Sequence, residues 1–469
     1  MALAFYDTLQ RERVPFEPLE AGHVRMYTCG PTVHDYAHIG NLRTFLFEDL
    51  LRRVLEARGY AVTQVMNLTD VDDKIIAKAN AAGETIAAFT ARYTEAFFED
   101  LETLRIERAE HYPTATGHID AMVDLIERLE AAGHTYRTDD GSIWFRISTF
   151  PGYGKLSRVD LSGMRDGARV ESDEYDKEDP KDFALWKAAR PGEEAWETAL
   201  GRGRPGWHIE CSAMSMAYLG ETFDLHTGGV DNIFPHHENE IAQSEAATGR
   251  PLARAWLHAE HLIVDGQKMS KSLGNFYTLR DVLERGWAPR AVRYLLLSVH
   301  YRQQLNFTFA GLEQAAASIE RLSDFVRRLE ELPAGDEPSP ELAERSRLAR
   351  EAFGAALDDD LNTSRALGVI FEWVRDVNRA VDEGRATAAD RPALIGVLEA
   401  FDAIYDVLES DSGDRELDAE IEALIEERER ARRERDWARA DELRGRLAER
   451  GIVVEDTPRG PRWKRAAGT

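Results

Sequence analysis

Residues 29–41, which read Cys-Gly-Pro-Thr-Val-His-Asp-Tyr-Ala-His-Ile-Gly-Asn, constrain the fold of this 469-residue chain more than any other stretch. A short apolar run at residues 24–27 precedes them, and apolar residues at helical spacing follow them. Gly30 and Gly40 permit backbone conformations that a β-carbon forbids. The pattern predicts a strand, a turn and a helix, with His38 just ahead of the helix N-terminus, where free N–H groups attract an anion.

The next elements extend this unit into a parallel α/β sheet. Residues 62–66 have the composition of a second strand after the first helix, and the strand–helix–strand order is typical of a parallel sheet. The aspartates within residues 67–74 follow that strand, where open α/β sheets bind ligands, although helix capping explains each of them equally well. Residues 133–204 are rich in Gly and Asp around a short strand near Ile143 and look like an insertion. We expect the sheet to resume with a strand at residues 206–214 that precedes a helix.

The second half of the chain is predominantly helical from about residue 279. Residues 332–340 contain three prolines and residues 410–414 are rich in Ser, Asp and Gly, so both stretches predict linkers. Residues 452–460 indicate a small hairpin near the C-terminus.

Composition indicates a cytoplasmic globular protein. The chain is 43% hydrophobic and 31% charged, without a signal-peptide pattern or an apolar run long enough for a membrane span. Two cysteines in a chain of this length argue against a disulfide framework. The net charge of −26 disfavours a nucleic-acid partner when taken globally, but residues 430–469 carry twelve basic against seven acidic residues. A solvated helical face with alternating charges is the alternative interpretation of that basic segment.

Four residues from separate stretches form a candidate metal site. His236 and Glu240 are four positions apart, so a helix after Pro235 would bring them to one face. Cys29 and Cys211 would add two thiolates, and two thiolates with an imidazole and a carboxylate suit zinc. Two buried thiols and an ordinary capping histidine would explain the same residues.

A cationic loop forms a second candidate site. Residues 268–272 read Lys-Met-Ser-Lys-Ser and follow Gly266. Lys268 and Lys271 flank Ser270 and would bind phosphates as point charges. An exposed lysine loop without a ligand is the alternative.

These stretches together carry a family resemblance. The segment His38-Ile39-Gly40-Asn41 resembles the HIGH signature of class I aminoacyl-tRNA synthetases, and residues 268–272 match their KMSKS signature in full. With residues 29–33, 207–211 and 235–240, they make the chain resemble the cysteinyl-tRNA synthetase family from about Tyr6 to Trp463. The chain departs from the family pattern at His34, where Tyr is usual, and at Thr227, which interrupts a glycine run.

The resemblance implies roles for individual residues. It implies one zinc ion per chain, with the ligands Cys29, Cys211, His236 and Glu240. It implies that the catalytic residues are His38, Asn41, Lys268 and Lys271, with Gly40, His38 and Lys271 at the nucleotide. It implies that the cysteine pocket contains Gly30, Thr69, Trp207, His226 and Asp231.

The resemblance also implies a reaction and its partners. L-Cysteine would attack ATP, bound with Mg²⁺, to give cysteinyl-adenylate, and tRNA(Cys) would then accept the cysteinyl group. Zinc would select the substrate thiol over the hydroxyl of serine, a distinction worth only about 1–3 kcal/mol in a purely shaped pocket. The family further implies a monomer that is not bound to a membrane.

The expected fold class is therefore α/β, with a Rossmann-like parallel-sheet catalytic domain that carries an insertion, followed by a helical bundle and a small C-terminal mixed α/β module. The expected units are the first catalytic half at 1–132, a connective insertion at 133–204, the second catalytic half at 205–255, a stem-contact region with the lysine loop at 256–310, an anticodon-side bundle at 311–409 and an anticodon-binding module at 414–469.

Other activities fit parts of the same pattern. A related ligase joins activated cysteine to an amino sugar, but it lacks a C-terminal module such as residues 414–469. A persulfide-forming activity with pyridoxal phosphate would use Lys74, Lys78, Lys268 and Lys271, which also suffice for tRNA charging. A catalytically inactive tRNA-binding protein is disfavoured because every recognised catalytic position is intact.

Overall fold

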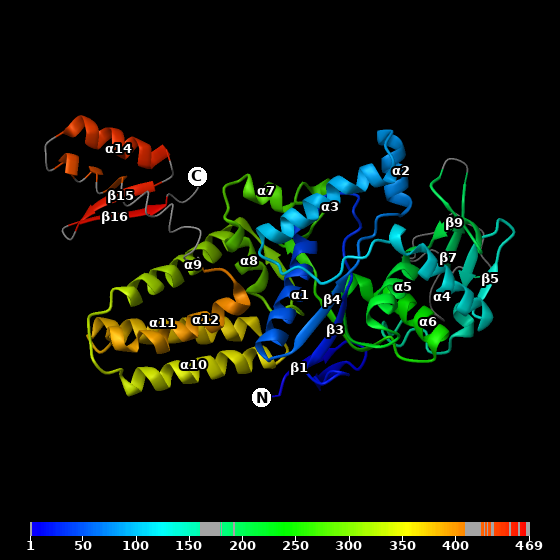
Figure 1. Ribbon diagram of the computed structural model, residues 1–469, viewed down its shortest axis with the longest axis horizontal. Helices are drawn as coiled ribbons and strands as arrows, with labels where there is room; N and C mark the ends of the chain where they lie inside the picture. The colour runs from blue at the N-terminus through cyan, green and yellow to red at the C-terminus, as the bar shows by residue number, and fades with distance from the viewer. Residues whose placement is uncertain are drawn as a thin grey trace.

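The computed structural model describes residues 2–159, 179, 181–190, 193–408, 424–425, 427–428, 430–432, 436–449, 452–457 and 460–465. At its centre lies a four-stranded parallel sheet, in which the strands run in the order β11-β10-β3-β4. Figure 1 labels β3 and β4 of this sheet. These strands are β3 (His23–Thr28), β4 (Ala61–Met66), β10 (Phe223–Gly229) and β11 (Ala253–Ala259). The predicted parallel α/β sheet is confirmed.

Both faces of this sheet are buried. Met26 packs in a core with α1 (Ile39–Ala57), whose Leu42 and Leu46 are fully buried. The adjacent residue Tyr27 points to the other face and packs in a core with Cys211 and Met214. Because successive residues of a strand alternate between faces, a sheet covered on both sides requires apolar residues at consecutive positions.

The predicted strand at residues 206–214 is wrong, because Trp207–Leu219 forms the helix α5. The strand of this region is the preceding β9 (Gly201–Pro205). Residues 209–215 of α5 are all buried, so the helix lacks the one-sided apolar stripe by which a surface helix is identified. Gly206 starts the helix where a β-carbon would lie 2.0 Å from the carbonyl oxygen of Ala184.

A second sheet occupies the region between β4 and β10 in the sequence. Its five strands are antiparallel in the order β5-β6-β7-β9-β8. The strands other than β9 are β5 (Thr135–Arg137), β6 (Ile143–Phe145), β7 (Phe183–Ala188) and β8 (Trp196–Thr198). Its core contains Phe145 and Leu185 together with Met122 and Ile126 of α4 (Ile119–Ala131). The short strand predicted near Ile143 is confirmed as β6.

The second half of the chain forms a group of helices, which Figure 1 shows in yellow-green to orange. The helical bundle consists of α9 (Phe309–Glu330), α10 (Pro340–Asp358), α11 (Thr363–Asp382) and α12 (Arg391–Tyr405). The elements outside the bundle and the two sheets described above are β1 (Ala4–Asp7), β2 (Glu12–Pro15), α2 (Asp73–Ala82), α3 (Ile86–Thr103), α6 (Glu238–Thr248), β12 (Leu262–Val264), β13 (Gln267–Lys268), α7 (Leu279–Leu283), α8 (Pro289–Leu297) and β14 (Leu305–Phe307).

The two linkers and the hairpin were predicted from composition. The first linker is confirmed between α9 and α10, while the second, at residues 410–414, lies outside the described residues. The hairpin is confirmed as β15 (Ile452–Thr457) and β16 (Gly460–Arg465), which pair antiparallel after α14 (Trp437–Glu449). Figure 1 shows this module at the end of the molecule that lies beyond α9.

Buried charges connect α1 to the helical bundle. Arg293 of α8 is 1% exposed and donates to Asp49 of α1 over 2.6 Å, and also to the carbonyl oxygen of Tyr405 at the end of α12. At the C-terminus of α1, Arg58 donates to Asp358 over 2.7 Å. Breaking the buried Arg293–Asp49 pair would leave one charge uncompensated, so this pair fixes α1 against α8. Arg58 is exposed, so its pair with Asp358 contributes less.

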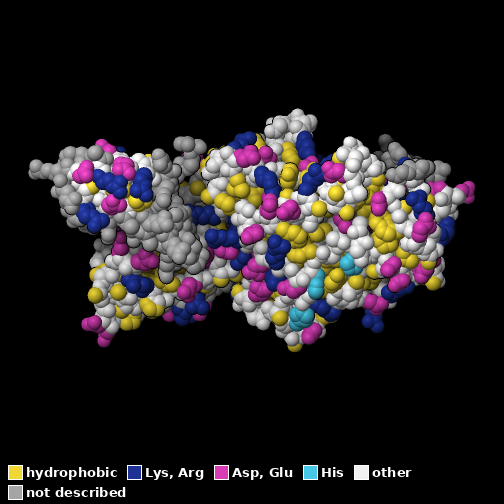
Figure 2. Space-filling view, turned by 45° about the horizontal axis from the view of Figure 1, so that its top comes forward, with side chains coloured by type: hydrophobic (Ala, Val, Ile, Leu, Met, Phe, Trp, Pro, Cys, Tyr) yellow, Lys and Arg dark blue, Asp and Glu magenta, His cyan; other side chains and the backbone are white. Residues whose placement is uncertain are grey.

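The surface carries both signs of charge. Figure 2 shows acidic and basic side chains interspersed over one face of the molecule. Among the helices of the described residues, none is long and apolar enough to cross a membrane.

Candidate functional site

The candidate site lies where the order of the parallel strands reverses. From β3 the chain continues through α1 to β4 on one side, whereas β10 pairs with β11 on the other. The loops that follow β3 and β10 therefore leave the same edge of the sheet in opposite directions, which opens a crevice for ligands in folds of this type. Cys29 and Gly30 follow β3, and Asp231 follows β10.

The four predicted metal ligands converge beside this crevice. The ligand atoms of Cys29, Cys211, His236 and Glu240 all lie within 4.8 Å of one another, and all four residues are buried. Cys29 comes from the end of β3, and Cys211 from α5 rather than from the strand that we expected at residues 206–214. His236 lies in the short helical turn Ile233–His237 and Glu240 in the first turn of α6, and their Nε2 and Oε1 atoms are 3.0 Å apart.

The electrostatics of this cluster favour a bound cation. A hydrogen bond with Cys29 lowers the pKa of Cys211 to about 6, whereas burial raises the pKa of Cys29. Burial also acts against ionisation of Glu240, but the neighbouring His226 and His236 outweigh it and lower the pKa of Glu240 to about 2. Burial acts against protonation of His236, but Glu240 and Cys211 outweigh it and raise the pKa of His236 to about 10. A bound cation would replace that proton as the positive charge that a buried thiolate and carboxylate need.

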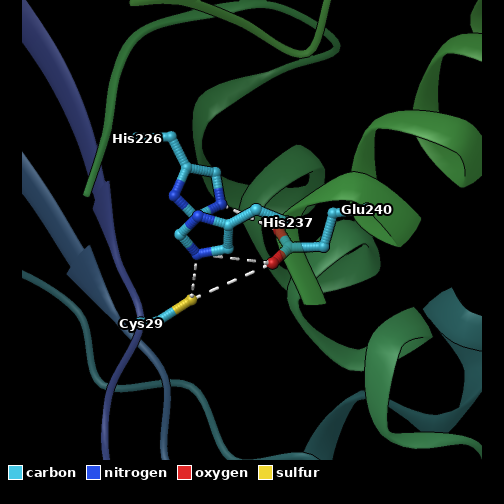
Figure 3. Close-up of side chains that lie close together, drawn as sticks. All are labelled: Cys29, His226, His237 and Glu240. Atoms are coloured by element: carbon cyan, nitrogen blue, oxygen red, sulfur yellow. Dashed lines mark hydrogen bonds and ion pairs between the residues drawn. The ribbon is translucent and has the colours of Figure 1, made fainter. Parts of the chain in front are cut away.

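A second set of potential ligands shares two residues with the first. Figure 3 shows Cys29 and Glu240 with His226 and His237, whose ligand atoms also lie within 4.8 Å of one another. The His237 Nε2 atom is 3.2 Å from the Cys29 sulfur, and the His226 Nε2 atom is 2.8 Å from Glu240 Oε2. The set with Cys211 fits zinc better, because it offers two soft sulfur ligands where this set offers one.

A shell of histidines surrounds the four ligands. The Nδ1 atoms of His208 and His236 are 2.9 Å apart, and His237 Nδ1 is 2.8 Å from His258 Nε2. The chain of contacts ends at the hydroxyl of Thr8, 2.8 Å from His258 Nδ1. Such outer partners orient metal-ligating side chains.

Sequence reasoning missed His208, His237, His258 and Thr8. Their sequence separations, up to 250 residues, gave no local pattern. The adjacent pair His236-His237 was the one available signal.

The residues predicted for the amino-acid pocket lie around this cluster, but they differ in exposure. Trp207 is 42% exposed and stacks on His236 with 4.5 Å between ring centroids. Thr69 is buried and donates to Glu210 over 3.0 Å. Gly30 donates its N–H to Asn67, and a β-carbon at Gly30 would lie 1.8 Å from the Asn67 carbonyl oxygen, so only glycine fits there.

The other two predicted pocket residues lie in the middle of β10 and just beyond its end. His226 is fully buried, donates from its Nε2 atom to the Glu240 carboxylate, and stacks on Trp256. Asp231 lies in the short turn Val230–Asn232 next to Gly229. The structure thus brings Asp231 and Trp207 to more accessible positions than His226.

The signature at the start of α1 forms a helix cap. His38 is the N-cap residue, its Nδ1 atom accepts from the Asn41 N–H over 3.1 Å, and Asn41 Oδ1 accepts from the His38 N–H over 3.2 Å. This reciprocal capping box orients both side chains at the helix N-terminus. A β-carbon at Gly40 would come within 3.3 Å of Met269 in the lysine loop, so the two signatures lie side by side.

The lysine loop is exposed and makes an ion pair with residues near the first signature. Lys271 donates to Asp35 over 2.6 Å, and its ammonium group lies 4.9 Å from the centre of the Phe276 ring. Phe276 in turn contacts the His38 ring edge-on. Lys268 is exposed on β13. The structure therefore brings Lys271 toward His38.

Comparison with family models identifies three regions. Residues 15–317 match the model described as tRNA synthetases class I (C) catalytic domain. Residues 352–409 match the DALR domain, and residues 414–463 match the cysteinyl-tRNA ligase anticodon binding domain.

Relatives match the chain from end to end. The cysteine–tRNA ligase of Solibacter usitatus (strain Ellin6076) is 55% identical over 466 residues, which covers 99% of this chain and 100% of that protein. The cysteine–tRNA ligase of Koribacter versatilis (strain Ellin345) is 49% identical over 494 residues, with 99% and 100% coverage.

Solved structures share the fold at low identity. Mycobacterium tuberculosis methionyl-tRNA synthetase in complex with methionyl-adenylate has a TM-score of 0.62 at 16% identity and covers 81% of this chain and 90% of that one. Agrobacterium radiobacter K84 agnB2 LeuRS, in its ternary complex, has a TM-score of 0.58 at 13% identity, with 83% and 85% coverage. These matches confirm the expected fold class of a parallel-sheet catalytic domain with helical additions.

Proposed function

The chain belongs to the cysteine–tRNA ligase family of class I aminoacyl-tRNA synthetases, and from this premise we propose that it attaches L-cysteine to tRNA(Cys) through a cysteinyl-adenylate intermediate. The observation that carries this proposal is the convergence of Cys29, Cys211, His236 and Glu240 beside a capped helix that begins with the first signature. One part of the site suits a thiol substrate, and the other suits a nucleotide.

We assign one zinc ion to the four converging residues. When bound, zinc supplies a soft Lewis acid that discriminates a thiolate from the hydroxyl of serine. The exposed ring of Trp207 stacks on the ligand His236, so a substrate side chain that approaches the ligands would contact that ring. An apolar pocket alone separates such isosteric substrates by only about 1–3 kcal/mol, which explains the need for a chemical criterion.

The chain's own residues would position the reactants for adenylate formation. The substrate carboxylate attacks the α-phosphorus of ATP, and pyrophosphate leaves. His38 and Asn41, fixed by their capping box, would bind phosphate oxygens at the start of α1. Lys268 and Lys271 would stabilise the negative charge that spreads over the phosphates in the transition state. ATP would enter with Mg²⁺.

Transfer to tRNA would involve the remaining units. A ribose hydroxyl of the tRNA 3′-terminal adenosine takes the cysteinyl group, and AMP leaves. We propose that residues 256–310 contact the acceptor stem, that the helices of 311–409 support the anticodon side, and that 414–469 contact the anticodon. The match of residues 414–463 to an anticodon-binding model supports the last assignment. It also disfavours the amino-sugar ligase, which lacks such a module.

The proposal is tested by cysteine-dependent exchange of pyrophosphate into ATP, followed by charging of tRNA(Cys). We expect exchange and charging with cysteine but neither with serine. Exchange without charging would favour the amino-sugar ligase, and absence of exchange at full zinc content would contradict the proposed activity.

A further inference from the structure

One carboxylate lies between two lysines from distant parts of the chain. Asp35 Oδ2 is 2.6 Å from the ammonium nitrogen of Lys271 in the lysine loop, and 3.6 Å from that of Lys78 in α2. Lys78 also donates to the carbonyl oxygen of His34 over 3.0 Å. Asp35 thus joins α2 to the loop that carries the second signature.

This arrangement adjoins the phosphate end of the site. Asp35 is three residues from the cap residue His38. Lys271 lies over the ring of Phe276, and His38 contacts the same ring in a T-shaped arrangement. An anion bound at the start of α1 would therefore lie close to the ammonium group that Asp35 now pairs.

Asp35, Lys78 and Lys271 together carry a positive charge that a second anion could neutralise. Two ammonium groups share one carboxylate, so a net positive charge remains. Burial acts against ionisation of Asp35, but its hydrogen bonds with Lys271 and the Tyr36 N–H, together with the charges of Lys271 and Lys78, outweigh this and lower the pKa of Asp35. All three side chains are partly exposed, with relative exposures of 65% for Lys271, 44% for Lys78 and 35% for Asp35, so a polyphosphate chain has access to them.

We propose that Lys78 is a further ATP-binding residue and that Asp35 is an internal anion which the polyphosphate of ATP displaces from Lys271 and Lys78. Carboxylate and phosphate oxygens are both acceptors for ammonium groups, so they compete for the same two lysines. The inference rests on the proposed function, because it assumes that ATP binds beside His38.

The direction in which Asp35→Asn changes the KM for ATP distinguishes this role from a structural one. If Asp35 competes with phosphate, then Asp35→Asn removes a negative charge from the path of ATP and lowers the KM for ATP. If Asp35 instead orders the loop or holds Mg²⁺, the same substitution raises the KM for ATP.

The experiment measures pyrophosphate exchange by the full-length zinc-loaded protein at varied ATP and at varied cysteine. We expect Asp35→Asn to lower the KM for ATP about threefold, in keeping with an exposed ion pair. We expect Lys78→Gln to raise it about tenfold and Lys78→Arg to restore most of the loss, because phosphate binding needs the charge. The KM for cysteine should stay unchanged in all three variants.

Asp324→Asn provides a matched control, since Asp324 pairs with Arg327 on the surface of α9, away from the site.

Inorganic tripolyphosphate serves as a second probe, and its inhibition constant should shift in the same direction as the KM for ATP. An unchanged or raised KM for ATP in Asp35→Asn, or an unchanged one in Lys78→Gln, would overturn the inference. Failure of the wild-type protein to catalyse exchange would instead contradict the proposed function, and tripolyphosphate binding by calorimetry would still test the anion site.

Discussion

The two ends of the candidate site, which we propose to bind a metal and a nucleotide, are built in opposite ways. At the metal end, Cys29, Cys211, His236 and Glu240 are all buried, and outer histidines such as His208 hold them. At the nucleotide end, Lys271 is 65% exposed and is held by a single carboxylate. Gly266 and Gly274 flank its loop with φ values of 76° and 67°, which favour glycine.

This difference matches the roles that we propose for the two ends. The thiol and hydroxyl of two small amino acids differ by one atom, so selection needs donor atoms fixed before the substrate arrives. Charge develops on the phosphates only as the reaction proceeds, so lysines that approach late stabilise the transition state more than the ground state. A buried, supported site and an exposed loop therefore suit the two tasks, and the following substitutions test this contrast.

The largest effect should come from removing a metal ligand. We expect Cys211→Ser to abolish zinc binding and to lower the rate of cysteine-dependent exchange more than about 100-fold. This loss exceeds the roughly 10–100-fold that is typical when a residue supporting a metal ligand is replaced. The reason is that a hydroxyl replaces a thiol whose pKa of about 6 makes it a thiolate at neutral pH. Metal content by atomic absorption and exchange kinetics measure both effects. Ser215→Ala on the same helix is the control, and a zinc-free Cys211→Ser protein with full activity would refute the metal assignment.

A change at the exposed end should separate chemistry from metal binding. We expect Lys271→Ala to slow exchange about 100-fold, the loss typical of one transition-state donor, with zinc content unchanged. Single-turnover adenylate formation measures the chemical step. A loss of zinc in this variant would show that the two ends are not independent.

A smaller effect should follow from weakening the support of the metal end. We expect His208→Ala to weaken zinc binding about tenfold, because His208 contacts the ligand His236 through its Nδ1 atom. Competition with a chelator measures the affinity, and the KM for ATP should not change. His118→Ala, a histidine that contacts Tyr218 outside the cluster, is the control. Equal zinc affinity in both variants would argue against an orienting role for His208.

The sequence predicted the local features of the site well, because they depend on neighbouring residues. The cap position of His38 follows from a turn and an apolar periodicity, and the structure confirms both. The pairing of His236 with Glu240 follows from helical spacing and is confirmed by their 3.0 Å contact.

Features that depend on tertiary packing could not be predicted from the sequence. Helix α5 was mistaken for a strand because residues 209–215 are buried on all sides and carry no helical stripe. The contact of Thr8 with His258 joins residues 250 positions apart, and no pattern in one sequence connects them. Residue types suggested the grouping of Cys29 with Cys211 but left two buried thiols as an alternative, and the family resemblance favoured the metal site.

The smallest effect on activity should arise at Glu48, which lies on α1 against β10. It is fully buried on α1, the helix that begins after His38, and it accepts from Thr227 of β10 over 2.8 Å. Its Oε2 atom has no hydrogen-bond partner among the described residues. Burial raises the pKa of Glu48 from 4.5 to about 8, so the side chain is mostly neutral at pH 7.

This raised pKa makes the stability depend on pH in a defined direction. Below pH 4.5 the carboxyl group is neutral in both the folded and the unfolded chain. Between pH 4.5 and about 8 the folded chain holds a proton that the unfolded chain has lost, so the free energy of unfolding falls as the pH rises. Glu48→Gln keeps the neutral form and should reduce this fall by about 1 kcal/mol or more, with activity near that of the wild type at pH 7. Thermal unfolding at pH 6 and pH 9 measures the slope, the surface variant Glu344→Gln is the control, and an identical slope in Glu48→Gln would mean that Glu48 is ionised in the folded protein.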